Sequence, residues 1–409
     1  MTMRSHLALS AELFCVLLTL ASLPAVCPGQ GPQQQGYPPW SVRKAQQWAE
    51  KTGWLVGCNY IPSTALNQLE MFQKATWDPL TIDRELALAQ RLGFNSVRVF
   101  LHHLLWKPDD PREQEEFLQR LDQFLGIADR HHLRATLVLF DGCWDANPRP
   151  GKQRPPIPFV HNSGWLQSPG TDLLLAFASS TAEQQLLESY VKGVVSRFAN
   201  DSRVVLWDVF NEPDNPNRPS YLAYTPSNKA ELALGLLRKA YSWIRDIAPV
   251  QPLTSGVWDL LSSASSSSPC SFLSLSPLVR FQLEQSDVIS FHNYGPLKEV
   301  QAVVRTLMLC SHPAGRPLLN TEFMARPMGS TFDPLLAWFK QHKIGAHSWG
   351  LVAGKTQAMM PWDSWWKVYQ ELPDVWFHDI FRADGTPFSP WEVEYIRNIT
   401  GAADSILRA

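Results

Sequence analysis

Two glutamates stand at the ends of two apolar segments, residues 204–213 and 317–323. The first segment ends in Asn211-Glu212-Pro213, and the second contains Glu322. The first is rich in the β-branched and aromatic residues that favour a buried strand, and Pro213 ends it. A carboxyl group at the end of such a strand is partly surrounded by apolar groups, which raises its pKa and suits it to donate a proton near neutral pH. The pair therefore indicates acid–base chemistry.

Eight short apolar segments recur along the chain, with helical patterns between most of them. They are residues 54–60, 96–101, 134–141, 204–211, 252–258, 288–294, 317–323 and 345–351. Strands that alternate with helices form a parallel sheet, and eight repeats in a chain of this length favour an α/β fold of the (β/α)8, or TIM-barrel, type in a single domain. A doubly wound open sheet is the alternative, which the absence of a glycine-rich phosphate loop after any strand disfavours.

The helical patterns and the long loops complete this arrangement. Helical periodicity covers residues 80–92, 113–131, 183–198, 228–247, 297–309 and 333–342, and residues 41–51 predict a helix packed under the barrel. Three long segments, 142–182, 259–278 and 352–390, read as loops that follow strands. We therefore expect them on the face where the carboxyl ends of the strands meet, which is the catalytic face of such barrels.

The ends of the other predicted strands carry further polar and aromatic side chains. Arg98, Asp141, His292, Tyr294 and Trp349 lie at or near these ends. In a barrel such positions converge from different sides on one pocket, together with the two glutamates.

At this point the sequence resembles a known family. The segment 207–213, with its Asn-Glu-Pro ending, resembles the acid/base motif of clan A retaining glycoside hydrolases, and most closely glycoside hydrolase family 5, the cellulase and mannanase family. Thr321-Glu322-Phe323 resembles the nucleophile strand of that family, and the resemblance runs over residues 53–349. The family usually has a histidine at the end of its third strand, where this chain has Phe140-Asp141-Gly142, so the substrate stays open.

The resemblance implies a mechanism with two carboxyl groups about 5 Å apart. Glu322 would attack the anomeric carbon and form a glycosyl-enzyme. Glu212 would first protonate the leaving oxygen and then deprotonate the water that releases the sugar. Arg98 would keep Glu322 ionised through its charge, and Tyr294 would donate a hydrogen bond to it.

The resemblance also implies a set of substrate-binding residues. Asn211 would bind the sugar 2-hydroxyl, His292 would bind sugar hydroxyls or orient the acid, and Trp349 would form a sugar platform. Each has a structural alternative: an ion pair for Arg98, core packing for His292 with Tyr294, and filling of the barrel for Trp349. Asp141 and Trp144 are equally consistent with contact to substrate and with anchoring of the loop that follows strand 3.

The chain contains seventeen tryptophans. Any one of them is by default a core residue, but several fall in or beside predicted loops, where aromatic faces can stack on the C–H faces of sugars. These are Trp106, Trp144, Trp165, Trp258, Trp349, Trp362, Trp365 and Trp366.

The N-terminus reads as a cleaved secretory signal over residues 1–29, followed by a lead and helix over 30–52 and the catalytic domain over 53–409. The apolar run 13–23 is too short to span a bilayer. Two sequons, at Asn200 and Asn398, would accept glycans in a secreted protein. An oxidising compartment permits disulfides among the cysteines of the mature chain, with three full pairings possible, and four buried free thiols are the alternative. These cysteines are Cys58, Cys143, Cys270 and Cys310.

Composition narrows the classes of partner. The net charge of −2 and the lack of a basic run argue against nucleic acid, and no second apolar stretch approaches membrane length. No metal and no other cofactor is expected. We expect a secreted monomer that hydrolyses a β-linked polysaccharide or oligosaccharide. The alternatives are a sugar-binding barrel without turnover and a metal-dependent barrel hydrolase. The latter needs a His-x-His on strand 1, which Gly57-Cys58-Asn59-Tyr60 lacks.

Overall fold

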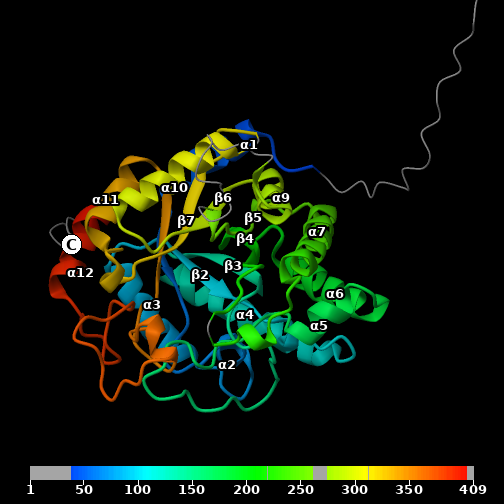
Figure 1. Cartoon of the computed structure of the whole chain (residues 1–409), viewed down its shortest axis with the longest axis horizontal. Coiled ribbons are helices and arrows are strands. Elements are labelled where there is room, and N and C mark those ends of the chain that lie inside the picture. Colours follow the sequence, from blue (N-terminus) through cyan, green and yellow to red (C-terminus); the bar gives the residue numbers. More distant parts are fainter. Residues whose placement is uncertain (1–37, 219, 261–273, 312, 403–409) are drawn as a thin grey trace, which may run out of the picture. The chain divides into compact units, whose positions relative to one another are not determined.

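The computed structural model describes residues 38–218, 220–260, 274–311 and 313–402, all within one compact unit, Gly36–Ala409. Eight parallel strands form its centre, in the order β5-β4-β3-β2-β1-β8-β7-β6 (Figure 1). They are β1 (Val56–Asn59), β2 (Ser96–Phe100), β3 (Arg134–Asp141), β4 (Val204–Asn211), β5 (Leu253–Thr254), β6 (Ile289–His292), β7 (Leu318–Phe323) and β8 (Gly345–Trp349).

The sheet closes between β5 and β6. Val257, which follows β5, forms a parallel bridge with Phe291 of β6. Its backbone N–H donates to Ser290 O at 3.0 Å, and its carbonyl accepts from His292 N at 3.0 Å. The predicted (β/α)8 barrel is therefore confirmed.

Helices surround this barrel (Figure 1). The described helices are α1 (Val42–Thr52), α2 (Gln68–Phe72), α3 (Pro79–Arg91), α4 (Pro111–Arg130), α5 (Thr171–Phe177), α6 (Thr181–Phe198), α7 (Lys229–Ile247), α9 (Pro277–Gln285), α10 (Leu297–Cys310), α11 (Phe332–Gln341) and α12 (Pro390–Thr400). All six helices predicted between strands are present within a few residues. Asp78 and Asp110 cap α3 and α4, and a proline follows each cap at the first helical position.

The structure differs from the prediction in two respects. The strand expected over 252–258 is reduced to Leu253–Thr254, because Val257 pairs with β6 while the Ser255 hydroxyl donates to Phe210 O at 2.8 Å. Helices α2, α5, α9 and α12 lie wholly or partly in segments without a predicted helix. Helices α2 and α5 have only five and seven residues, too few for a helical period to stand out in the sequence.

The lower end of the barrel, where the strands begin, is closed by α1, as predicted. Buried residues at the strand starts form a cluster of their own, against which Trp48 of α1 packs: Leu55, Val205, Leu206, Val288 and Leu319. The backbone of Trp40, just before α1, donates to Asp287 Oδ1 at 2.7 Å. The opposite end of the strands is thereby left for the site.

Several predictions fall outside the described residues. They concern the secretory signal, Cys270 and most of the loop 259–278. Among the described residues, Cys58 and Cys143 are free and buried, whereas Cys310 is disulfide-bonded. Each of the three full pairings uses Cys58 and Cys143, so full pairing is wrong, and the disulfide of Cys310 shows that the alternative of four free thiols is wrong too. No helix in the described ranges is both long enough and apolar enough to cross a bilayer.

Candidate active site

A cleft of about 470 Å³ opens at the carboxyl ends of the strands. The side chains of Asn211, Glu212, His292, Tyr294 and Glu322 line it. Its walls also include Trp144, Trp165, Trp258, Trp349, Trp362 and Trp366. Six of the eight tryptophans expected in or near loops thus border one cavity, which gives it the aromatic surface that sugar rings require.

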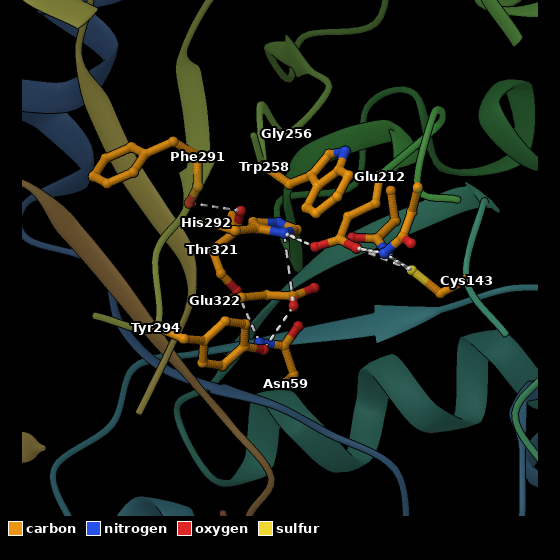
Figure 2. Close-up of polar contacts among 12 residues, drawn as sticks. Asn59, Cys143, Glu212, Gly256, Trp258, Phe291, His292, Tyr294, Thr321 and Glu322 are labelled. Carbon is orange, nitrogen blue, oxygen red and sulfur yellow. Dashed lines mark hydrogen bonds and ion pairs between the residues drawn. The ribbon is translucent and has the colours of Figure 1, made fainter. Parts of the chain in front are cut away.

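His292 lies between the two glutamates (Figure 2). Its Nδ1 is 2.6 Å from Glu212 Oε1 and 3.6 Å from Glu322 Oε2. One ligand atom from each of the three residues can be chosen so that all lie within 4.8 Å of one another. The two carboxyl groups therefore have the close spacing of a retaining pair rather than the wide spacing that leaves room for an attacking water.

Glu322 is held by two donors. Arg98 Nη1 donates to its Oε1 at 2.8 Å, and the Tyr294 hydroxyl donates to its Oε2 at 2.8 Å. Burial raises the pKa of Glu322, while His292, Arg98 and the Tyr294 hydroxyl act against this shift and Glu212 adds to it. The two donors favour the ionised form of Glu322 over that of Glu212.

Arg98 is fully buried at the centre of this network. Its Nε and Nη2 donate to Asp208 Oδ2 at 3.0 and 2.8 Å, and Nη2 also donates to Asn211 Oδ1 at 2.6 Å. Asp208, in the middle of β4, was not among the residues singled out from the sequence. The signal was available, because a carboxylate inside a wholly buried strand requires a cationic or hydrogen-bonding partner.

Glu212 directly follows β4 in a left-handed backbone conformation, with φ of 42°. Asn215 Nδ2 donates to its Oε2 at 2.6 Å, and the Cys143 thiol donates to the same oxygen at 3.1 Å (Figure 2). Burial raises the pKa of Glu212 against these two hydrogen bonds. Cys143 could not be assigned to this carboxyl from the sequence, because its loop meets Glu212 only in the folded barrel. Asn215 lies three residues after Glu212 in the same loop.

The pair of glutamates is set up to share one proton. Both pKa values are raised by burial, and two carboxylates so close together repel each other. Burial lowers the pKa of His292 to about 4, so the imidazole is neutral at neutral pH. The direct hydrogen bond from Arg98 to Glu322 favours the state in which Glu322 is ionised and Glu212 carries the proton. Because Glu212 Oε2 accepts two hydrogen bonds, the proton belongs on Oε1.

Asp141 and Asn211 support the site from below. Asp141 is fully buried, and its carboxylate accepts from Trp165 Nε1 at 2.6 Å, Gln68 Nε2 at 3.0 Å and Asn211 Nδ2 at 3.0 Å. It does not line the cleft and holds the Asn211 amide instead. Burial raises the pKa of Asp141 to about 6.

Gly142, which follows Asp141, approaches the backbone of Glu212 closely. A Cβ at this position would collide with the Glu212 carbonyl oxygen. Gly142 thus allows the loop after β3 to pack directly on the backbone of Glu212.

Trp144 and Trp349 are half-buried and both line the cleft. Trp144 stacks on Trp365 with ring centroids 5.4 Å apart, and its backbone N–H donates to Asn217 Oδ1 at 2.7 Å. Trp349 packs edge-on against Phe100 and Trp165. Both indoles are therefore fixed by protein contacts while part of each ring borders the cavity.

Among the residues that the structure describes, one group of side chains could hold a metal ion: Glu212, His292 and Glu322. The chemistry of the donors does not fit this use. The Arg98 guanidinium lies 2.8 Å from Glu322, and the carboxylate oxygens already accept hydrogen bonds from Tyr294 and Asn215. A cation here would face a fixed positive charge and would have to displace these donors.

Comparisons with known proteins agree with this geometry. The sequence model of the family described as Cellulase (glycosyl hydrolase family 5) matches residues 61–365. None of the curated proteins compared with the chain matches it.

Solved structures share the fold at low sequence identity. The exo-β-1,4-mannosidase Op5Man5 from Opitutaceae bacterium strain TAV5 is 20% identical, with a TM-score of 0.53 over 86% of this chain and 60% of that one. The endo-1,4-β-mannanase from Rhizomucor miehei is 12% identical, with a TM-score of 0.52 over 87% of this chain and 95% of that one. The β-1,4-mannanase from the sea hare Aplysia kurodai is 17% identical, with a TM-score of 0.50 over 72% and 87%.

Proposed function

The chain belongs to glycosyl hydrolase family 5 and is a retaining β-glycoside hydrolase, and from this premise we propose that Glu322 is its nucleophile and Glu212 its acid/base. The observation that carries the assignment is the different surroundings of two neighbouring carboxyls. Glu322 accepts hydrogen bonds from a guanidinium and a phenol, whereas Glu212 accepts them from an amide and a thiol and lies beside a neutral imidazole.

In the first step Glu322 Oε attacks the anomeric carbon of the bound sugar and the glycosidic C–O bond breaks. Glu212 gives its Oε1 proton to the departing oxygen, so the leaving group departs as a neutral alcohol. Arg98 and Tyr294 hold Glu322 in position for this attack. Because Arg98 is itself fixed by Asp208 and Asn211, the nucleophile has little freedom to move away.

In the second step Glu212, now ionised, takes a proton from a water molecule that attacks the glycosyl-enzyme and releases Glu322. His292 Nδ1 contacts Glu212 Oε1 at 2.6 Å, so the imidazole orients the acid in both steps. Asn211 lines the cleft, but its Oδ1 and Nδ2 are engaged by Arg98 and Asp141. A contact between Asn211 and the sugar 2-hydroxyl would therefore use amide atoms that already bond to Arg98 and Asp141.

We propose a β-linked polysaccharide or oligosaccharide as substrate. β-1,4-Mannosides come first in order of testing, because several proteins of similar structure are mannanases or mannosidases. We also propose secretion of a monomer. The disulfide of Cys310 and the exposed sequon residues Asn200 and Asn398 support an oxidising, glycosylating compartment.

The test is a panel of 4-nitrophenyl β-glycosides, mannans, glucans and xylans, followed by proton NMR of the anomer that forms first. Retention, as a β-product from a β-substrate, is expected, and a chelator should leave the rate unchanged. An α-product at early time would mean inversion and would refute the nucleophile role of Glu322. Loss of activity with the chelator, restored by a divalent cation, would favour a metal-dependent hydrolase.

A further inference from the structure

A second, smaller cavity of about 20 Å³ adjoins the cleft. The two share Asn162, Trp165 and Trp349 as walls. The other walls come from strand ends and from the segments that follow β1 and β8, namely Asn59, Tyr60, Ile61, Phe100, Gly350, Leu351, Val352, Thr356, Ala358 and Asp379. Aromatic rings and several polar side chains, among them Asn162 and Asp379, thus surround a space that borders the cleft at Trp349.

Two buried oxygens of this cavity's walls lack a hydrogen-bond partner, Asp379 Oδ2 and Asn162 Oδ1. Each residue is only 2% exposed. A buried acceptor without a donor costs free energy, and native proteins satisfy nearly all such groups. Because the Asn162 oxygen and the ionised Asp379 carboxylate both accept hydrogen bonds, the group that completes them is a donor. The pKa of Asp379, raised by burial to about 7, agrees with a carboxyl that lacks protein donors.

The backbone here is held in uncommon conformations. Asn162 and Asp379 both have positive φ, 44° and 55°. Gly350, with φ of 79°, lies so close to Asp379 that a Cβ would collide with the carboxylate Oδ1. Non-glycine residues in this region cost free energy and are retained where the surroundings fix them, often at ligand sites. The Asp379 carboxylate therefore packs directly against the backbone of Gly350, the residue that follows β8.

The place of the cavity relative to the two glutamates decides which part of a substrate it meets. Under the proposed function the leaving group would lie on the side of Glu212, near Trp258 of the segment after β5 (Figure 2). The transferred sugar would then lie over Glu322 of β7 and Trp349 of β8, which both line the cleft. The small cavity continues past Trp349 toward β1. It therefore borders the transferred sugar on the side away from the bond that breaks.

We propose that the enzyme releases single sugars from the non-reducing end of its substrate, and that Asp379 and Asn162 accept hydrogen bonds from hydroxyl groups of that terminal sugar. This inference rests on the proposed function. A space of about 20 Å³ holds hydroxyl groups or an ordered water but is far too small for a further sugar ring. Aromatic walls beside two acceptors suit a sugar, whose C–H faces stack while its hydroxyls donate.

The first measurement uses the unaltered enzyme and β-1,4-linked pentasaccharides of mannose and of glucose, with and without a 4-O-methyl cap on the non-reducing end. Exo action predicts that early digests of the uncapped substrate contain only monosaccharide and tetrasaccharide, and that the cap slows release at least tenfold. Early disaccharide or trisaccharide, or equal rates on both substrates, would overturn the proposal. No hydrolysis of any glycoside would instead refute the proposed function.

The second measurement compares Asp379→Asn with Asp363→Asn, which makes the same change in the same loop after β8 but outside both cavities. Loss of one hydrogen bond from a sugar hydroxyl to the Asp379 side chain predicts a fall in kcat/KM of about tenfold for Asp379→Asn. Asp363→Asn should stay within about twofold. If Asp379→Asn changes only the melting temperature, the cavity holds an ordered water and the proposal fails. If Asp379→Asn does not fold, the rates of the unaltered enzyme on capped and uncapped substrates test the proposal.

Discussion

Glu212 receives its hydrogen bonds from residues of three different loops or strand ends. His292 contacts one oxygen, while Asn215 and Cys143 donate to the other. Burial raises the pKa of the Cys143 thiol, so it remains protonated and serves as a donor over the working pH range. The thiol thus acts on the acid rather than on the substrate, and its effect should be visible in the pH dependence of the reaction.

Cys143→Ala should shift the alkaline limb of the kcat/KM profile upward. The thiol stabilises the ionised form of Glu212, so its removal raises the pKa of that acid, which must be protonated to work. A shift of roughly 0.5 to 1 pH unit is expected for one such hydrogen bond. Cys143→Ser keeps a donor and should retain the limb of the unaltered enzyme. An unchanged limb in Cys143→Ala would show that the thiol only fills space.

At the scale of elements, the loop between β3 and α6 brings Trp144 to the cleft and joins it to Trp365 of the loop after β8. Trp144→Ala should raise KM about threefold to tenfold through lost stacking, with a small change in melting temperature because the ring is half-buried. Trp391→Ala is the matched control, because its ring is 58% exposed and stacks on Tyr395 in α12, away from the cleft. Unchanged kinetics with a loss of stability would assign Trp144 to packing alone.

The sequence predicted the elements better than the contacts between them. The eight strand positions and six helices followed from periodicity, because each strand and helix carries its own apolar pattern. Helix α2 did not, since five residues show no helical period. Strand β5 lies inside the predicted segment 252–258 but is shorter than predicted. The sequence also predicted that Glu212 and Glu322 share one pocket, because both lie at strand ends and barrel closure brings all such ends together.

Contacts made by long loops could not be read in the same way. The sequence left the choice between substrate contact and loop anchoring open for Asp141, which the structure places beneath Asn211. No local sequence pattern predicts the hydrogen bonds that Cys143 and Asn215 donate to Glu212. The same holds for the Asp379 Oδ2 atom, which has no hydrogen-bond partner, because its position depends on the conformation of a long loop. Their roles emerge only from burial and from which polar atoms remain unpartnered.

At the scale of the whole molecule, the remaining proposal is secretion. Expression in an animal cell that secretes glycoproteins should yield protein in the medium that lacks residues 1–29. Asn200→Gln and Asn398→Gln should each remove the mass of one glycan, because both asparagines are exposed. N-terminal sequencing and intact-mass measurement check this. Unglycosylated protein that keeps Met1 inside the cell would contradict it.

The central claim, that Glu212 and Glu322 have different roles, is tested most directly by azide rescue of their alanine variants. With a dinitrophenyl β-glycoside, whose leaving group needs no protonation, Glu212→Ala should form the glycosyl-enzyme and stall. Azide needs no general base, so it should restore turnover and give the β-glycosyl azide. Glu322→Ala should lose activity on natural and activated substrates, and direct attack by azide should give the α-azide. The α-azide from Glu212→Ala with the β-azide from Glu322→Ala would mean reversed roles, and less than about a hundredfold loss on a natural substrate in both variants would place the chemistry elsewhere.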